Sequence, residues 1–292
     1  MATMPGTRIA RFRDIRAACP LCGSTTLSHE FNLNFYATGL SWDRCKSCSL
    51  VFQNPQLSTQ GLRGLYKASS YFGGSALSAY DDYVANDPGR IAQSYRRLDL
   101  IRSRTGISGG ALLDIGSASG FFGYAAKQRG FDVTCVEPDD AMCAVGRSKY
   151  DLDMRTDTLE TFDPKGRLYD IVTLWGTDSH FENALEGFRK INSMLKPSGI
   201  LAMNYQNFDH PIRVVFPGIK QSFSASYNLS AKSMKMLMDK SGFAIRWSRT
   251  EWQQATLGHI AHITKIRIPQ RMKEIQVRVY AISFNVVLAE RK

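Results

Sequence analysis

From residue 111 onward, the hydrophobic positions of the chain alternate between two periods. Short, nearly unbroken apolar runs indicate buried strands. They are separated by segments in which apolar residues recur every three or four positions, as in amphipathic helices. The pattern predicts strands at residues 111–115, 132–136, 169–174, 200–203, 243–247 and 280–288, and helices at residues 121–128, 139–149, 182–195 and 231–240. Strands that alternate with helices of this length indicate βαβ units, so the predicted fold class is α/β, with a doubly wound and mostly parallel sheet.

The part of the chain before this alternation divides into three segments. Residues 1–18 are expected to form a solvated basic tail, which is favoured over the transit peptide that its arginines faintly suggest. Residues 19–55 contain paired cysteines, and residues 56–105 are expected to form a mainly helical connector that ends in one helix over residues 90–104. Residues 106–292 then form the α/β domain, so the chain has one large domain with an appendage.

The paired cysteines have the spacing of a metal site. Cys19 and Cys22 form one C-x-x-C pair, Cys45 and Cys48 form another, and 22 residues separate the pairs. Two such turns let four thiolates converge in a tetrahedron around Zn²⁺, and a β-hairpin carrying residues 31–42 fits the gap. An iron–sulfur cluster and a redox dithiol are the alternatives. Because cysteine fills every ligand position, the expected zinc ribbon is structural.

Charge and hydropathy leave the partner open. The net charge of +11 permits an anionic or polyanionic partner, but the basic residues are dispersed along the chain. No apolar run approaches the ~18 residues that a membrane span requires, and the N-terminus lacks the apolar core of a secretory signal. Paired cysteines without such a signal favour a reducing compartment, so a cytoplasmic location is predicted.

A glycine-rich turn follows the first predicted strand and opens a helix. It contains Asp114 and ends at Gly120, and Glu137 closes the next strand. Small residues let backbone N–H groups approach a ligand, and a carboxylate at the tip of the second strand can accept hydrogen bonds from ribose hydroxyls. NAD is a rival ligand, but Asp114 suits a cation better than a pyrophosphate. The pattern therefore favours S-adenosylmethionine (SAM).

At this point the chain resembles class I SAM-dependent methyltransferases that carry an N-terminal zinc ribbon with four cysteines. The resemblance extends from Cys19 nearly to the C-terminus, and its motifs read CPLCGS, CKSCSLVFQNP, LLDIGSASGFF, VEPD, LKPSGIL and KSGF. The resemblance implies a seven-stranded Rossmann-like sheet. The family usually has D-x-G-x-G-x-G in the turn, whereas Ala118 replaces the middle glycine here. Alanine tolerates a narrower range of backbone angles, so this departure bears on cofactor binding.

The resemblance also implies a role for particular residues. The turn would hold the methionine part of SAM, Glu137 would bind the ribose, and Asp157, Thr158 and Leu159 would contact the adenine. Trp175 would lie near the sulfonium, where its ring could stabilise the cation, with ordinary core packing as the alternative. The implied cofactor-binding residues are Asp114, Gly116, Ser117, Ala118, Gly120, Glu137, Asp157, Thr158, Leu159 and Trp175.

His180 is the candidate general base, because the fourth strand of related proteins runs into a Glu-His pair. Ser179 replaces the glutamate here, and a second family histidine would fall near Ala225 and is missing. Tyr227 or Asn228 is expected to fill that space. A purely structural hydrogen bond is the alternative role for His180. The remaining histidines, His29, His210, His259 and His262, have no comparable context.

The favoured function is methyl transfer from SAM to a small-molecule or glycosyl acceptor, an acceptor class that the resemblance implies. The acceptor is expected to contact residues 205–228 and 250–275. An RNA methyltransferase is a second candidate, since a zinc ribbon and basic charge suit phosphate contacts, but the dispersed charge counts against it. A third candidate is a non-catalytic interaction protein. It is favoured slightly by Ala118, Ser179 and Ala225, which stand where the family has other residues.

Overall fold

The computed structural model describes residues 12–35, 38–58, 61, 87–211, 226–264, 266–273 and 275–292. Two sheets organise these residues. One has seven strands in the order β10-β11-β8-β7-β4-β5-β6, and the other has four strands in the order β1-β2-β3-β9. The predicted connector between residues 62 and 86, and Ala225, lie outside the described residues.

The seven-stranded sheet confirms the predicted α/β fold. Its strands are β4 (Gly110–Ile115), β5 (Phe131–Val136), β6 (Asp153–Arg155), β7 (Tyr169–Trp175), β8 (Leu195–Gln206), β10 (Phe243–Thr256) and β11 (Gln276–Arg291). Strands β6, β5, β4, β7 and β8 pair in parallel, and the antiparallel hairpin of β10 and β11 joins the edge of β8. Glycine turns and short helices therefore gather at the carboxyl ends of the central strands, where open α/β sheets bind ligands.

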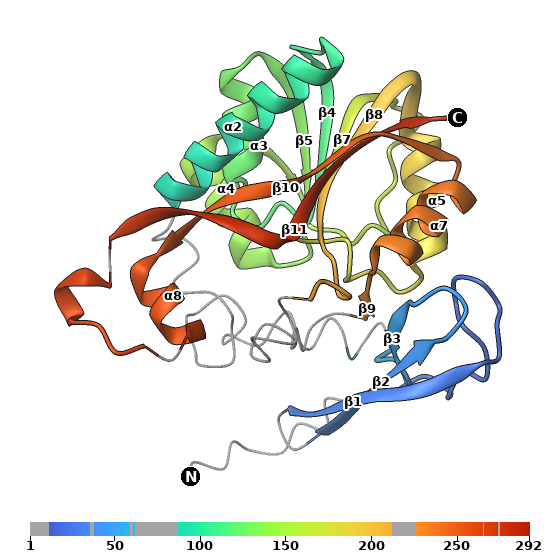
Figure 1. Cartoon of the computed structure of the whole chain (residues 1–292). Helices are drawn as coiled ribbons and strands as arrows, with labels where there is room; N and C mark the ends of the chain where they lie inside the picture. Colours follow the sequence, from blue (N-terminus) through green and yellow to red (C-terminus); the bar gives the residue numbers. More distant parts are fainter. Residues whose placement is uncertain are drawn as a thin grey trace.

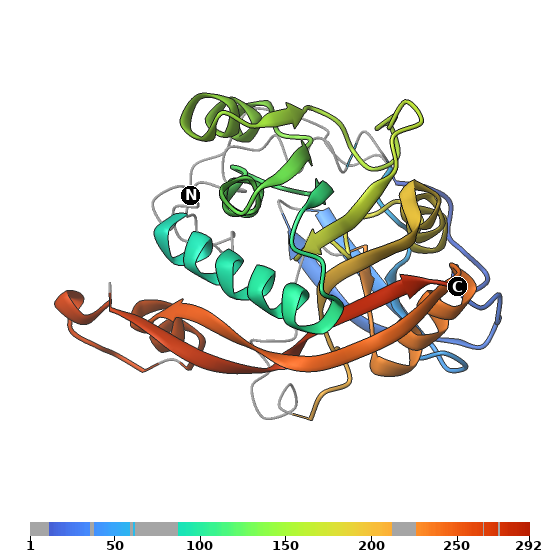
Figure 2. The same cartoon turned by 90° about the horizontal axis from the view of Figure 1, so that it is seen from above.

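Helices cover both faces of this sheet (Figures 1 and 2). Successive residues of β4 show the two faces: Leu112 packs in one core cluster and Leu113 in the other, because neighbouring side chains of a strand point in opposite directions. Burial on both faces explains why the strands are nearly continuous apolar runs. The first cluster lies under α2 (Asp87–Thr105), α3 (Phe121–Gln128) and α4 (Asp140–Tyr150), and the second under α5 (Ala184–Met194) and α7 (Ala231–Lys240).

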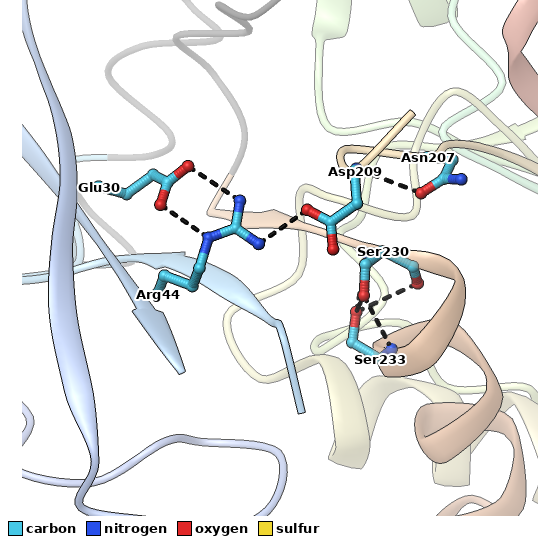
Figure 3. Close-up of polar contacts among 6 residues, drawn as sticks. All are labelled: Glu30, Arg44, Asn207, Asp209, Ser230 and Ser233. Atoms are coloured by element: carbon cyan, nitrogen blue, oxygen red, sulfur yellow. Dashed lines mark hydrogen bonds and ion pairs between the residues drawn. The ribbon is translucent and has the colours of Figure 1, made fainter. Parts of the chain in front are cut away.

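Local capping sets the helix ends. Asn183 caps α5 and accepts hydrogen bonds from the N–H groups of Leu185 and Glu186, at 3.1 and 3.4 Å, so this helix starts two residues after the predicted start. Ser230 and Ser233 form a reciprocal capping box at the start of α7 (Figure 3). No helix within the described ranges has both the length and the apolar character needed to cross a membrane.

Three features of the larger sheet were not predicted. Strand β6 is only three residues long, and β10 continues nine residues beyond the predicted end at residue 247. The connection from β10 to β11 contains α8 (Leu257–Thr264) and the short 3-10 helix η2 (Gln270–Met272). Figure 1 shows that this hairpin extends as an arm away from the body of the molecule.

The smaller sheet contains the predicted hairpin. Strands β1 (Leu27–Phe35) and β2 (Thr38–Cys45) are antiparallel, with Phe31 opposite Trp42 and their rings stacked at 4.9 Å. Strand β3 (Val51–Gln53) pairs with β2, and β9 (Tyr227–Asn228) pairs with β3. We call residues 19–55 the ribbon. A strand that lies between β8 and α7 in the chain therefore completes the sheet of the ribbon.

The ribbon packs on the larger domain through apolar and polar contacts. Its cysteines, with Leu21 and Phe52, belong to the same buried cluster as α5 and α7. Lys240 at the end of α7 donates a hydrogen bond to the Leu21 carbonyl at 3.1 Å. Arg44 of β2 binds both carboxylate oxygens of Glu30, at 2.7 and 2.9 Å, and also Asp209 beyond β8, at 2.7 Å (Figure 3). These contacts fix the ribbon beside the carboxyl ends of β7 and β8 (Figure 1).

Candidate functional site

The glycine-rich turn leaves β4 in a left-handed conformation. Gly116, Ala118 and Gly120 have φ values of 69°, 49° and 84°. A Cβ atom on Gly116 would lie 2.3 Å from Thr177 Oγ1, so glycine is required for the turn to approach the loop after β7. Ala118 adopts a positive φ although it is not glycine, which costs backbone strain. The turn is thus built for close approach, and Ala118 is its strained member.

Glu137 lies directly after β5 and ties the turn to this strand. Its carboxylate accepts hydrogen bonds from the N–H groups of Ala118 and Asp139, at 2.8 and 3.1 Å. The side chain is 4% exposed, and burial raises the pKa of this carboxyl group to about 7. Each carboxylate oxygen has a further lone pair that these bonds do not use, so the group can accept further hydrogen bonds from a ligand.

Asp114 in β4 is a second buried acid at the same edge of the sheet. It accepts a hydrogen bond of 2.6 Å from the hydroxyl of Thr173, a residue of β7 that sequence reasoning missed. Burial raises the pKa of Asp114 to about 7, although the Thr173 hydrogen bond and the nearby charge of Arg97 act in the opposite direction. The negative charge of Asp114 also raises the pKa of Glu137. Two adjacent buried carboxyl groups make a site that favours a cation.

Trp175 at the end of β7 packs between protein groups. The guanidinium carbon of Arg97 lies 4.1 Å from the centroid of the Trp175 ring, and the ring of Phe122 lies at 5.3 Å. Trp175 Nε1 is buried and has no hydrogen-bond partner among the described residues. These contacts show how the ring is packed, and the role of Trp175 near the sulfonium stays a prediction.

A buried ion pair holds Arg97 in this position. Arg97 donates to both carboxylate oxygens of Glu251 in β10, at 2.6 and 2.8 Å, and Gln93 donates to the same carboxylate at 2.7 Å. All three side chains are buried. Sequence reasoning missed this group, because 154 positions separate Arg97 from Glu251 and no local pattern links them.

The predicted adenine segment follows β6. The N–H of Glu137 donates to the Arg155 carbonyl at 3.0 Å, which brings this segment to the tip of β5. Asp157 accepts a hydrogen bond from the hydroxyl of Thr161, and Thr158 contacts the same hydroxyl. Leu159 is 3% exposed and packs in the core cluster that also contains α5. Among the three, Asp157 and Thr158 are half-buried and retain surface towards solvent.

His180 lies in the segment after β7, which we call the β7 loop (residues 177–183). The His180 side chain is half-buried, and its backbone N–H donates to the Thr177 carbonyl at 3.1 Å. Asp178 in the same loop is 7% exposed, and burial raises the pKa of its carboxyl group to about 7. Sequence reasoning missed Asp178 as a titratable group; its place at the carboxyl end of a parallel strand was the available signal.

Strand β9 borders the β7 loop. The N–H groups of Ser226 and Tyr227 donate to the Ser179 carbonyl, at 2.8 and 3.3 Å. The hydroxyl of Tyr227 donates to the Glu182 carbonyl at 2.7 Å, so it is already engaged. Asn228 Nδ2 and Ser226 Oγ are buried and have no hydrogen-bond partner in the described part of the chain. Of the two residues expected near the missing histidine, Asn228 therefore has the unused donor.

The four paired cysteines converge in the ribbon. All four sulfur atoms lie within 4.8 Å of one another, with Cys19 and Cys48 at 3.6 Å and Cys22 and Cys45 at 3.5 Å. None of the four forms a disulfide. A tetrahedral site with Zn–S distances of ~2.3 Å places its sulfur atoms ~3.8 Å apart, so the donor set fits zinc. Cys135 and Cys143, by contrast, are separate buried thiols, as predicted.

The other histidines belong to other elements of the chain. His29 is exposed on β1, and His210 follows β8 in a turn. His259 and His262 lie on α8, but their side chains are outside the described residues. Within the described ranges, the four cysteines are the only group of three or more potential ligands that could hold a metal ion.

Comparison with known proteins identifies the family. A family model described as a methyltransferase domain matches residues 84–247, which is more than half of the chain. The chain belongs to the methyltransferase domain family. The match begins before α2 and ends within β10, so this methyltransferase carries its ribbon outside the matched region. A search of curated proteins found no significant match.

Solved structures with the same fold include several methyltransferases. Magnesium protoporphyrin IX methyltransferase from Synechocystis PCC 6803, with bound S-adenosylhomocysteine (SAH), is 15% identical, with a TM-score of 0.51, and the similarity covers 78% of this chain and 94% of that one. A SAM-dependent methyltransferase from Leishmania major is 15% identical, with a TM-score of 0.51 and coverage of 79% and 84%. The YcgJ protein from Bacillus subtilis is 14% identical, with a TM-score of 0.50 and coverage of 68% and 98%. These similarities show the fold of the methyltransferase.

Proposed function

We propose that this methyltransferase transfers the methyl group of SAM to a small-molecule or glycosyl acceptor. The observation that carries the proposal is the pair of buried carboxyl groups, Asp114 and Glu137, beside the left-handed turn after β4. Two such groups favour a ligand that brings positive charge and ribose hydroxyls, and SAM has both. A pyrophosphate between the same two acids would be repelled, which disfavours NAD.

Each part of the site then has a proposed role. The amino-acid part of the ligand is held by Asp114 and the turn of Gly116, Ser117, Ala118 and Gly120. Glu137 accepts hydrogen bonds from the ribose hydroxyls. Asp157, Thr158 and Leu159 border the adenine, and Trp175 supports the site beside Arg97. When bound, SAM supplies a methyl group activated by a positively charged sulfur. The protein mainly aligns this group with the acceptor.

The β7 loop is the proposed acceptor side. A neutral His180 imidazole can accept a proton from an acceptor hydroxyl or amine near neutral pH, because the ordinary pKa of histidine is ~6.5. The four cysteines are proposed to hold one structural zinc ion. Four cysteines would fill all four ligand positions of the ion, so the zinc contributes to folding of the ribbon and not to methyl transfer.

Ligand binding and methyl transfer test the proposal together. Calorimetry with SAM, SAH and NADH should show binding of the first two and no binding of NADH. The purified protein is then incubated with SAM carrying a radioactive methyl group and the low-molecular-mass fraction of a cell extract. Label should appear in small molecules. Label in RNA would support the RNA methyltransferase, and micromolar binding of NADH without binding of SAM would overturn the cofactor.

His180→Ala is expected to lower the rate of methyl transfer by about 10²- to 10⁴-fold and to change the pH dependence of the rate, because the proton acceptor is lost. The measurement is the pH profile of radioactive transfer. His29→Ala is the control, since His29 is exposed on β1 and lies outside the segments expected to contact the acceptor. A pH profile that is the same in wild type and His180→Ala leaves His180 with only a structural hydrogen bond.

Binding of SAM is expected to release protons at pH 7. Burial raises the pKa values of Asp114 and Glu137 to about 7, so both groups are partly protonated in the free protein. A cationic ligand favours the ionised carboxylates, which lowers their pKa values and expels protons. The binding enthalpy should therefore differ between phosphate and Tris buffers in the sense of proton release. Asp114→Asn should reduce the difference, and net proton uptake would contradict the assignment.

A further inference from the structure

The β7 loop is held from one side by residues around the ribbon. The Glu182 carbonyl accepts hydrogen bonds from the Tyr227 hydroxyl, at 2.7 Å, and from the side-chain amide of Gln56, at 2.9 Å. The Glu182 carboxylate pairs with Arg13. The Ser179 carbonyl accepts from two N–H groups of the segment that forms β9. Both ends of the loop therefore have contacts to elements that flank the cysteine cluster.

A short path leads from these contacts to the cysteines. Cys45 and Leu50 close the second cysteine turn through a backbone hydrogen bond of 2.9 Å, and β3 begins at the next residue, Val51. Val51 lies opposite Asn228 and Phe52 lies opposite Tyr227 in the sheet. Phe52 and Tyr227 are also buried in one cluster with three of the cysteines. The position of β9 thus depends on β3, and β3 follows directly from the metal-binding turn.

Among the described residues, no such link reaches the side of the site that is proposed to bind SAM. Asp114 is hydrogen bonded to Thr173, and Glu137 to Ala118 and Asp139. All of these residues belong to the central sheet or its turns. In the part of the chain that the structure describes, Arg13, Gln56 and the segment of β9, which flank the ribbon, contact the β7 loop, and the two buried acids are held by the larger domain.

We propose that the ribbon positions the β7 loop for the acceptor, and that Tyr227 is the positioning residue that transmits this support. The inference rests on the proposed function, because it takes the β7 loop as the acceptor side. Tyr227 acts through the Glu182 carbonyl and does not itself touch the methyl group. The metal-binding turn stabilises β3, β3 holds β9, and the Tyr227 hydroxyl fixes the end of the loop that carries His180.

Hydrogen–deuterium exchange of the zinc-loaded protein tests this inference. Tyr227→Phe removes one hydroxyl and keeps the buried ring. Peptides covering residues 177–183 are expected to exchange about three- to tenfold faster in this variant, which corresponds to the loss of one hydrogen bond. Tyr169→Phe is the matched control, because Tyr169 is equally buried but lies at the opposite end of β7. Exchange of the β7 loop in the control should equal that of wild type.

Two further measurements separate positioning from general stability. The NMR signal of the His180 ring, assigned through His180→Gln, should move in Tyr227→Phe and stay in Tyr169→Phe. Affinity for SAH should remain within about twofold of wild type in both variants. Unchanged exchange and an unchanged His180 signal in Tyr227→Phe would overturn the inference. A loss of SAH affinity that is equal in Tyr227→Phe and Tyr169→Phe would also overturn it. Failure of wild type to bind SAH would instead overturn the proposed function, while the exchange data still decide the contact.

Discussion

Cys45→Ser is expected to remove the metal and unfold the ribbon. Cys45 is fully buried, and its sulfur lies 3.5 Å from that of Cys22, so serine would leave three thiolates around the ion. Structural zinc sites contribute roughly 10–16 kcal/mol to the folding of small domains. We expect zinc content to fall from one ion per chain to near zero, together with a lower melting temperature. Elemental analysis and thermal unfolding measure the two effects.

Cys135→Ser is the matched control for this prediction. Cys135 is equally buried, but it lies in β5 outside the cluster. This variant should keep its zinc even if the core is weakened by the new hydroxyl. Full retention of zinc by Cys45→Ser would contradict the four-cysteine site. Visible absorption together with iron in the purified protein would replace zinc by an iron–sulfur cluster.

Glu137→Ala is expected to weaken SAM binding by about 10- to 100-fold. The substitution removes the carboxylate that is proposed to accept hydrogen bonds from the ribose hydroxyls. A hydrogen bond to a charged group contributes roughly 1.5–3 kcal/mol. It also frees the N–H groups of Ala118 and Asp139, which loosens the strained turn. Calorimetric titration of wild type and variant with SAM gives the ratio of the two dissociation constants.

Two variants sharpen this measurement. Glu137→Gln keeps one carbonyl oxygen and the shape of the side chain, so it should lose less affinity than alanine. Glu186→Ala removes an exposed glutamate that pairs with Arg189 on α5, and it should bind SAM as wild type does. If Glu137→Ala binds SAM with the affinity of wild type, the acid at the tip of β5 does not hold the ribose.

The elements that carry the candidate site were predictable because their signals are local. The run from β4 through α3 and β5 to α4 consists of apolar strands, glycine turns and a capping Asp139, each readable within a few residues. The hairpin of the ribbon was readable for the same reason. The predicted ends of these four elements agree with the structure to within one residue, and those of the hairpin to within a few residues.

The missed elements depend on distant partners. Strand β9 has only two residues and exists because it pairs with β3, so no local pattern could predict it. The contact between Arg97 and Glu251 joins α2 to β10, although 154 positions of the sequence separate the two residues. The hydrogen bond between Thr173 and Asp114 crosses two strands that neighbour each other in space alone. The sequence pattern thus located the site, while tertiary contacts decide how its charges are held.

The order of strands has a consequence for shortened versions of this methyltransferase. Strand β11, the last in the chain, lies between β10 and β8 in the sheet. A fragment trimmed to residues 84–247 would lose β11 and Glu251. The edge of β8 would then present unpaired N–H and carbonyl groups, a template for aggregation, and Arg97 would sit in the interior with its charge unbalanced. A soluble catalytic fragment must therefore extend at least through Arg291.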